Sequence, residues 1–181
     1  MTTIALAGNP NSGKTTLFNA LTGTHQQVGN WPGVTVEKKS GYFSYADGER
    51  VELVDLPGTY GLGTNDSEGS GGIDEQIARQ FLESGAVDLV INVVDALSLN
   101  RSLFLTNELT KRRVPMIVVV NMMDVAAANN IEIDFDALSQ SLGCPVLPVS
   151  ASKRDGIDDV KIAIAQAVPA QSISVESSEI E

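Results

Sequence analysis

Eight residues near the N-terminus have the types and spacing of a phosphate-binding loop. Residues 8–15 fit the pattern G-x-x-x-x-G-K-[ST]. In such a loop the glycines let successive backbone N–H groups and a helix N-terminus face a phosphate. Lys14 adds a positive charge at the β- and γ-phosphates, and the Thr15 hydroxyl can bind Mg²⁺. The alternative is an ordinary glycine-rich turn between a strand and a helix. The residues expected at the phosphates are Gly8, Asn9, Pro10, Asn11, Ser12, Gly13, Lys14, Thr15 and Thr16.

A second group of residues is placed to bind a nucleotide base. Asn121 and Asp124 form an Asn-x-x-Asp pair directly after an apolar run. The Asp124 carboxylate can accept from both guanine N1–H and the 2-amino group, whereas adenine offers neither donor and would leave the charge unpaired. Guanine is therefore favoured, and the alternative is a solvated cap at a strand end. Ser150-Ala151-Ser152, after a later apolar run, would supply a backbone N–H to guanine O6. The expected base site comprises Asn121, Met122, Asp124, Ser150, Ala151 and Ser152.

Two further segments are expected around the γ-phosphate. The run Asp55-Leu56-Pro57-Gly58 places a carboxylate to hold Mg²⁺ through water and the Gly58 N–H within reach of the γ-phosphate. Thr35, which follows Gly33 and Val34, is the expected second hydroxyl ligand of Mg²⁺. Loops held by such contacts are ordered with GTP and released with GDP. Lys14, Thr35 and Gly58 are therefore expected to act in catalysis.

The elements that must position these motifs alternate along the chain. Short apolar runs separated by helix-like segments are typical of a parallel sheet with helices on both faces. Strands are expected at residues 3–7, 51–54, 88–94, 115–120 and 145–149, and a sixth at 34–45 would turn at residues 46–48 into an antiparallel hairpin. Helices are expected at residues 14–21, 74–84, 99–113, 135–142 and 157–167, with Asp74 and Asp134 as caps. The predicted fold class is α/β, with three layers around a mostly parallel six-stranded sheet that has one antiparallel edge strand.

Three stretches show no regular pattern. Residues 24–33 and 58–72 are expected to be irregular, and long loops of this kind in a compact domain are usually functional or mobile. Residues 169–181 are rich in Ser and Glu and are expected to fray. The sequence therefore predicts one nucleotide-binding domain over residues 1–168, followed by a polar tail.

Charge and composition narrow the class of partner. A formal net charge of −11 argues against nucleic acid as a partner, since binding to its phosphates normally needs a basic face. The single cysteine, Cys144, excludes an internal disulfide. No apolar run reaches the roughly 18 to 20 residues that span a bilayer, so the chain as given is expected to be soluble.

In this order the motifs resemble those of translation-factor-class small GTPases, and three runs narrow the resemblance further. Residues 9–19, 28–37 and 54–60 are similar to the cytosolic G domain of the bacterial ferrous-iron transporter B family (FeoB). The Asn-Trp-Pro-Gly-Val-Thr-Val-Glu run at residues 30–37 is the specific part, because many GTPases share the other motifs. The resemblance extends from about residue 3 to residue 168.

The resemblance implies a Ras-like fold, GTP hydrolysis that regulates Fe²⁺ uptake, and a K⁺ ion that assists catalysis. In potassium-activated relatives the position of Asn11 coordinates K⁺, and backbone carbonyls at Gly29 and Trp31 complete the site. Asn11 thereby joins the expected catalytic residues. The residue after Gly58 is Thr59, where many GTPases have the Gln that orients the attacking water. K⁺ would stand where an arginine finger otherwise places positive charge.

The resemblance also implies partners and a location. Family members continue into a small helical domain and a polytopic membrane domain, so the chain is expected to be a fragment that works with both. Its place in the full protein would be the cytoplasmic face of the bacterial inner membrane, and oligomerisation of the full protein is left open. The implied cofactors are GTP or GDP, Mg²⁺ and K⁺.

Two other functions stay open from the sequence. A GTP sensor that binds without turnover would fit the missing Gln, whereas Asn11 favours the enzyme. A ribosome- or tRNA-linked GTPase can carry the same loop asparagine, but its expected basic surface does not fit the net charge.

Overall fold

A seven-stranded sheet forms the centre of the computed structural model, which describes residues 1–45, 48–63 and 72–168. The strand order is β2-β3-β4-β1-β5-β6-β7. β4, β1, β5, β6 and β7 run parallel, while β3 is antiparallel to both of its neighbours. The strands are β1 (Thr2–Gly8), β2 (Gln26–Asn30), β3 (Glu37–Tyr45), β4 (Glu49–Asp55), β5 (Leu89–Asp95), β6 (Met116–Asn121) and β7 (Val146–Pro148).

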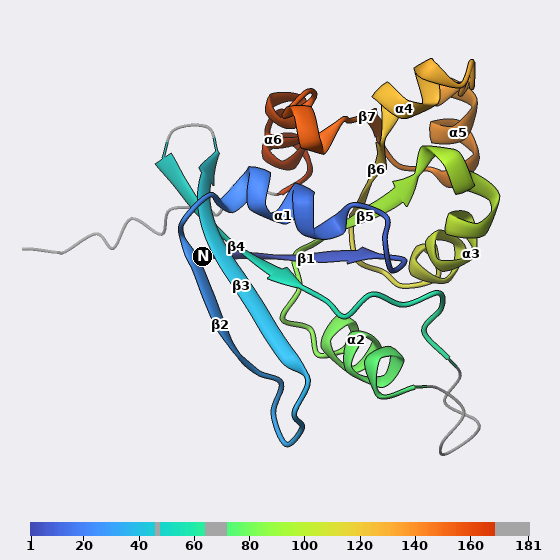
Figure 1. Ribbon diagram of the computed structural model, residues 1–181. Coiled ribbons are helices and arrows are strands. Elements are labelled where there is room, and N and C mark those ends of the chain that lie inside the picture. The colour runs from blue at the N-terminus through green and yellow to red at the C-terminus, as the bar shows by residue number, and fades with distance from the viewer. Residues whose placement is uncertain (46–47, 64–71, 169–181) are drawn as a thin grey trace, which may run out of the picture.

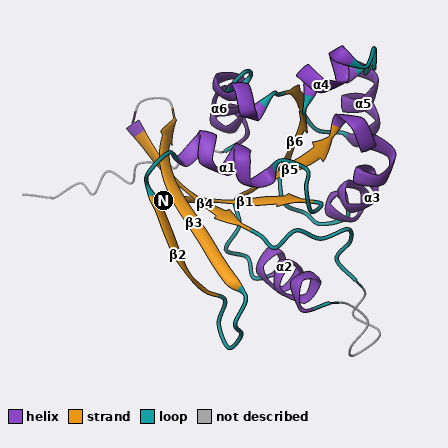
Figure 2. Ribbon diagram, viewed as in Figure 1, coloured by secondary structure: helices purple, strands orange, loops and turns teal. Residues whose placement is uncertain are grey.

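Helices cover both faces of this sheet and give three layers (Figures 1 and 2). They are α1 (Lys14–Thr22), α2 (Ile73–Glu83), α3 (Leu99–Thr110), α4 (Met123–Ala128), α5 (Phe135–Leu142) and α6 (Ile157–Ala167), with short 3₁₀ turns η2 (Ala96–Ser98) and η3 (Ala151–Lys153). Successive side chains of β1 point to opposite faces, as in any strand. Ile4 and Leu6 pack with α1 and α6, whereas Ala5 and Ala7 pack with α2 and α3. The two apolar layers hold the strand ends, and hence the loops after them, in fixed positions.

The α/β fold class is confirmed, and so are the five parallel strands and the hairpin from β3 into β4. The strand count and the position of the antiparallel strand need correction. The prediction that residues 24–33 are irregular is wrong, because Gln26–Asn30 forms the edge strand β2 and pairs with β3 from Gln26↔Gly41 to Asn30↔Glu37. β3 is therefore second from the edge. The polar, glycine-containing sequence of β2 has little intrinsic strand preference, and pairing with β3 determines its conformation.

Helix boundaries show one confirmed cap, one wrong cap and one missed helix. Asp134 Oδ1 accepts from the Ala137 N–H at 2.9 Å and caps α5 as predicted. Asp74 is not a cap, because α2 begins at Ile73 after Gly72. Its carboxylate lies in the first turn of α2, where its negative charge still interacts favourably with the helix dipole. The six-residue helix α4 was not predicted, since so short a segment carries little periodicity.

Two predicted segments fall partly or wholly outside the described residues. Residues 58–63 form a loop, as expected, and residues 64–71 are not described. The tail at 169–181 is also outside the description. Among the residues that are described, no helix is both long and apolar enough to cross a bilayer.

Candidate nucleotide site

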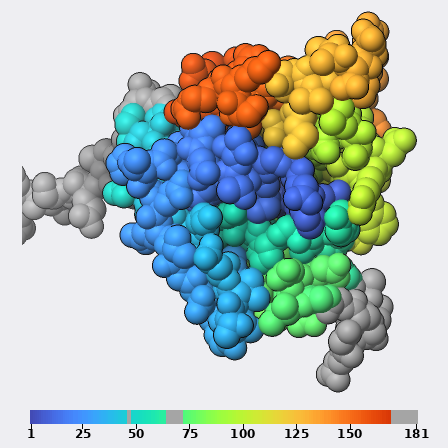
Figure 3. All heavy atoms as spheres, in the orientation of Figure 1, coloured from blue at the N-terminus to red at the C-terminus, as the bar shows by residue number. Residues whose placement is uncertain are grey.

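The loop between β1 and α1 wraps one side of an open cavity. Asn11 and Gly13 both have left-handed backbone angles, with φ of 65° and 82°. A Cβ at Gly13 would collide with Nδ2 of Asn121, so only glycine fits this close approach. The cavity has a volume of about 500 Å³ and is lined by Asn9, Pro10, Asn11, Gly13, Lys14, Thr15, Gly58 and Asp74. Most of the predicted phosphate-binding loop thus faces one space, and in Figure 3 its atoms lie beside those of α3.

A charged pair links this loop to the end of β4. Lys14 Nζ forms an ion pair with Asp55 Oδ1, and the two side chains are only 10% and 12% exposed. Burial raises the pKa of the Asp55 carboxyl above its ordinary value and outweighs the opposite effect of the Lys14 charge. β1 and β4 are parallel neighbours with Leu6 opposite Asp55, so the sheet register brings the two motifs together.

The residues after Asp55 are bonded to the β1 end and the phosphate loop. The Leu56 N–H donates to the Leu6 carbonyl at 3.0 Å, and the Thr59 N–H donates to the Gly8 carbonyl at 3.2 Å. A Cβ on Gly58 would lie 3.2 Å from the Pro10 nitrogen, which is tighter than an ordinary contact. Gly58 therefore sits against the phosphate loop.

Asn121 connects the predicted base site to the phosphate loop. Its Nδ2 donates to the Ser12 carbonyl at 3.1 Å, and its Oδ1 accepts from the Ala151 N–H at 3.0 Å. The side chain is 3% exposed. Both of its polar atoms are thus bonded to protein backbone, and three motifs from distant parts of the sequence meet at this residue.

Asp124 lies beside the same tripeptide, with its carboxylate less enclosed. Its N–H donates to Ser150 Oγ at 3.1 Å, and its Oδ2 lies 3.4 Å from Lys153 Nζ. Burial acts to raise the pKa of Asp124, but the Val125 N–H and the Lys153 ammonium together outweigh it and hold that pKa below its ordinary value. Met122, at φ 64°, turns the chain from β6 into α4 and points this segment toward the tripeptide.

The structure does not bring the end of the β2–β3 hairpin to this site. Thr35 is exposed, and neither it nor Gly29 or Trp31 lines the phosphate-loop cavity. Figure 1 shows the hairpin end directed away from the loop between β1 and α1. Gly29 pairs with Lys38 across the hairpin, and the Trp31 carbonyl accepts from the Val34 N–H at 3.2 Å. The predicted K⁺ ligands at these two positions are therefore separated from Asn11 in this conformation.

Trp31 is instead packed on α2. It is 6% exposed, and its ring meets Phe81 edge to face with centroids 5.3 Å apart. Lys38 Nζ lies 5.1 Å from the Trp31 ring centroid. No motif in the sequence marks this contact, which joins residues fifty positions apart.

Two residues near the site had no predicted role there. Asp74 lines the phosphate-loop cavity from the first turn of α2, and Lys153 pairs with Asp124 from η3. No motif marks either residue, because each reaches the site only through the packing of its helix or turn.

Comparison with known proteins places these features in a family. A family model described as "Ferrous iron transport protein B" matches residues 2–164. The Fe(2+) transporter FeoB of Escherichia coli (strain K12) is 57% identical over 162 residues, which is 90% of this chain and 21% of that protein. The chain thus spans about a fifth of the length of such relatives.

Solved structures agree with the sequence match. The crystal structure of the G domain of the T. maritima FeoB iron transporter has a TM-score of 0.83 and 45% identity, covering 92% of this chain and 98% of that one. The cytosolic domain of the same T. maritima protein in its GMPPNP form has a TM-score of 0.84 and 43% identity, covering 92% of this chain and 63% of that one. A relative with the same fold is therefore known with a guanine nucleotide analogue.

Proposed function

Since the chain belongs to the ferrous iron transport protein B family, we propose that it is a G domain that hydrolyses GTP to GDP and phosphate. One observation carries this proposal. The phosphate loop, Asp55 and the pair Asn121 and Asp124 follow the carboxyl ends of the parallel strands β1, β4 and β6. Ligands of open α/β sheets bind at that edge.

The phosphate loop supplies the contacts to the triphosphate. The loop residues that line the cavity and the N-terminus of α1 would offer backbone N–H groups to the phosphates, and Lys14 would exchange Asp55 for the β- and γ-phosphates. The Gly58 N–H would donate to the γ-phosphate. The Thr15 hydroxyl and the Asp55 carboxylate are oxygen donors of the kind that Mg²⁺ prefers, and Thr35 would join them from the hairpin. When bound there, Mg²⁺ would supply positive charge that offsets the negative charge developing during phosphoryl transfer.

The base site selects guanine through Asp124. Its carboxylate is ionised and positioned beside η3, where it can accept from the two guanine donors. Asn121 fixes the phosphate loop and the tripeptide that starts at Ser150 relative to each other. Base and phosphates are therefore held at a set spacing.

We also propose that K⁺ stimulates hydrolysis through Asn11. Asn11 lines the phosphate-loop cavity, and Thr59 stands where a water-orienting Gln would be expected. K⁺ would add positive charge beside the β- and γ-phosphates, a form of electrostatic stabilisation that can be worth a hundredfold in rate. The carbonyls of Gly29 and Trp31 can join Asn11 only after the hairpin end leaves its present hydrogen bonds.

Single-turnover hydrolysis in KCl and in NaCl tests both parts. We expect GTP but not ATP to be cleaved, with a rate in KCl about a hundredfold above that in NaCl. Asn11→Ala should lose most of the K⁺ stimulation and keep its GDP affinity, because Lys14 and the loop N–H groups remain. Equal rates in both salts would overturn the role of K⁺. GTP binding without turnover in either salt would favour the sensor.

In the full protein, we propose that the GTP/GDP state of this domain regulates ferrous-iron uptake at the cytoplasmic face of the inner membrane, through a helical domain and a membrane domain. The support is the family and the share of its members that this chain spans. Fe²⁺ uptake into proteoliposomes by the full protein should fall when Lys14→Ala is introduced. Unchanged uptake with GTP hydrolysis abolished would contradict this coupling.

A further inference from the structure

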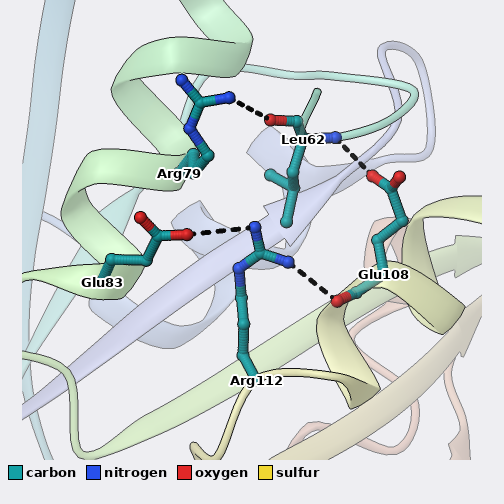
Figure 4. A network of polar contacts seen from close by, with 5 residues as sticks. All are labelled: Leu62, Arg79, Glu83, Glu108 and Arg112. Atoms are coloured by element: carbon teal, nitrogen blue, oxygen red, sulfur yellow. Dashed lines mark hydrogen bonds and ion pairs between the residues drawn. The ribbon is translucent and has the colours of Figure 1, made fainter. Parts of the chain in front are cut away.

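Leu62 has both of its backbone polar groups bonded to charged side chains. Its N–H donates to Glu108 Oε2 at 2.5 Å, and its carbonyl accepts from Arg79 Nη1 at 3.3 Å (Figure 4). Glu108 belongs to α3 and Arg79 to α2, so two helices hold one backbone position in the loop after β4. Hydrogen bonds to ionised groups are roughly twice as strong as neutral ones. Leu62 is 1% exposed, so its backbone polar groups depend on these two protein partners.

The backbone of Glu108 is bonded to one member of a second pair of charged side chains, which do not contact Leu62. Its backbone carbonyl accepts from Arg112 Nη1 at 2.9 Å, and Arg112 Nη2 lies 3.4 Å from Glu83 Oε1 on α2. The chain passes close to Glu108 at Gly61, where a Cβ would lie 3.1 Å from both Glu108 Oε2 and Phe104 Cε1. The carboxylate therefore lies directly against the loop backbone at Gly61 and Leu62.

This contact fixes one end of the segment that contains Gly58. At the other end the Leu56 N–H donates to the Leu6 carbonyl at 3.0 Å, and between the two the Thr59 N–H donates to the Gly8 carbonyl at 3.2 Å. Residues 56–62 are thus anchored to the end of β1 on one side and to α3 on the other. A short segment with two anchors restricts the direction of the Gly58 N–H.

We propose that Glu108 is a positioning residue for GTP hydrolysis, which orients the Gly58 N–H toward the γ-phosphate by fixing the backbone at Leu62. The proposal rests on the hydrolysis proposed above. Donors that are oriented in advance stabilise a transition state without reorganisation, and small displacements of such groups reduce the rate strongly. Ground-state binding depends mainly on Lys14 and the phosphate loop, so Glu108 acts on kcat more than on KM.

Three variants and two measurements test this role. Glu108→Ala removes the acceptor and leaves the buried Leu62 N–H unpaired, whereas the amide oxygen of Glu108→Gln can still accept from it. Glu83→Gln is the matched control, because Glu83 belongs to the same network without contacting Leu62 and is 46% exposed. We expect kcat to fall about ten- to a hundredfold in Glu108→Ala, with KM and GDP affinity within about twofold, and Glu108→Gln to recover most of the rate.

Hydrogen exchange of the nucleotide-free protein gives a readout that does not depend on turnover. The Leu62 amide should exchange faster in Glu108→Ala and stay protected in Glu108→Gln and Glu83→Gln. Should Glu108→Ala not fold, Gly61→Ala displaces the carboxylate without removing it. We then expect a smaller fall in kcat and a smaller increase in exchange at the Leu62 amide.

The outcomes separate this proposal from the function on which it rests. Faster exchange at Leu62 with kcat unchanged would overturn the positioning role, because the contact would then be structural only. Protection of Leu62 that is the same in Glu108→Ala as in the unmodified protein would overturn the contact itself. Absence of GTP turnover in the unmodified protein would refute the proposed hydrolysis, with the exchange results still deciding the contact.

Discussion

The side-chain amide nitrogen of Asn121 lies 3.1 Å from the carbonyl oxygen of Ser12, so the base motif is bonded directly to the phosphate loop. The amide oxygen of the same side chain accepts from the Ala151 N–H at 3.0 Å. Three loops that follow β1, β6 and β7 meet at this one buried residue. The spacing between the phosphate and base sites therefore depends on a side chain that sequence reasoning assigned to the base alone.

Asn121→Ala should destabilise the protein even without nucleotide. The substitution leaves the Ser12 carbonyl and the Ala151 N–H without a partner, and one buried unpaired group costs about 1–3 kcal/mol. We expect the free energy of unfolding in urea to fall by at least this amount and GDP affinity to fall with it. Asn107→Ala, at an exposed position of α3, serves as the control and should change neither. An Asn121→Ala protein with unaltered stability would mean that these two bonds contribute little.

Asp124→Asn should change which base is bound. The carboxylate accepts from two guanine donors, and each charge-assisted hydrogen bond contributes about 1.5–3 kcal/mol. Loss of the charged acceptor should therefore weaken GDP binding by a few kcal/mol. The amide of Asn offers a donor in place of one acceptor, so xanthosine diphosphate should now bind. Calorimetry with guanosine and xanthosine diphosphate measures this change in base preference. Lys153→Ala removes only the exposed partner of Asp124 and should have a small effect. ATP binding to the unmodified protein as tightly as GTP would disprove the assignment.

Guanine selectivity should persist in mild acid. The pKa of Asp124 lies below its ordinary value of 3.8, so the carboxylate stays ionised above that value and loses its charge only as the pH falls through the lowered pKa. The ratio of GDP to ADP affinity isolates this effect, because phosphate protonation acts on both nucleotides alike. We expect a constant ratio from about pH 8 to about pH 5. A ratio that drops within this range would show that the Asp124 pKa is raised instead.

Local sequence predicts the parts of the site that follow directly after strands. The phosphate loop, Asp55 and Asn121 each follow an apolar run, and the parallel order of those runs brings them to one edge. The strand β2 was missed because its conformation depends on pairing with β3 and not on its own residues. The bond from Leu62 to Glu108 joins residues 46 positions apart and leaves no periodic signal.

Residues at the end of the β2–β3 hairpin show a different limit of prediction from sequence. Thr35 was expected as an Mg²⁺ ligand from its place in the loop, and Gly29 and Trp31 as K⁺ ligands from the family resemblance. In the structure Trp31 packs on α2, whereas Thr35 and Gly29 are exposed. A sequence motif states which residues can meet, and the bound nucleotide then decides whether they do.

Trp31 should report the nucleotide state by its fluorescence. It is the single tryptophan of the chain, and it is buried against Phe81 with its ring N–H unpaired within the described residues. If Thr35 is to bind Mg²⁺ with GTP, the hairpin end must move, and Trp31, four residues away, must leave Phe81. We expect a non-hydrolysable GTP analogue with Mg²⁺ to shift Trp31 emission to longer wavelength and to increase its quenching by acrylamide, relative to GDP. Phe81→Ala should expose Trp31 in both states and abolish the difference, while Val28→Ala, at an exposed position of β2, should preserve it. Identical emission with saturating GDP and GTP analogue would show that the hairpin end stays docked on α2, and Thr35 could then not serve as the second hydroxyl ligand.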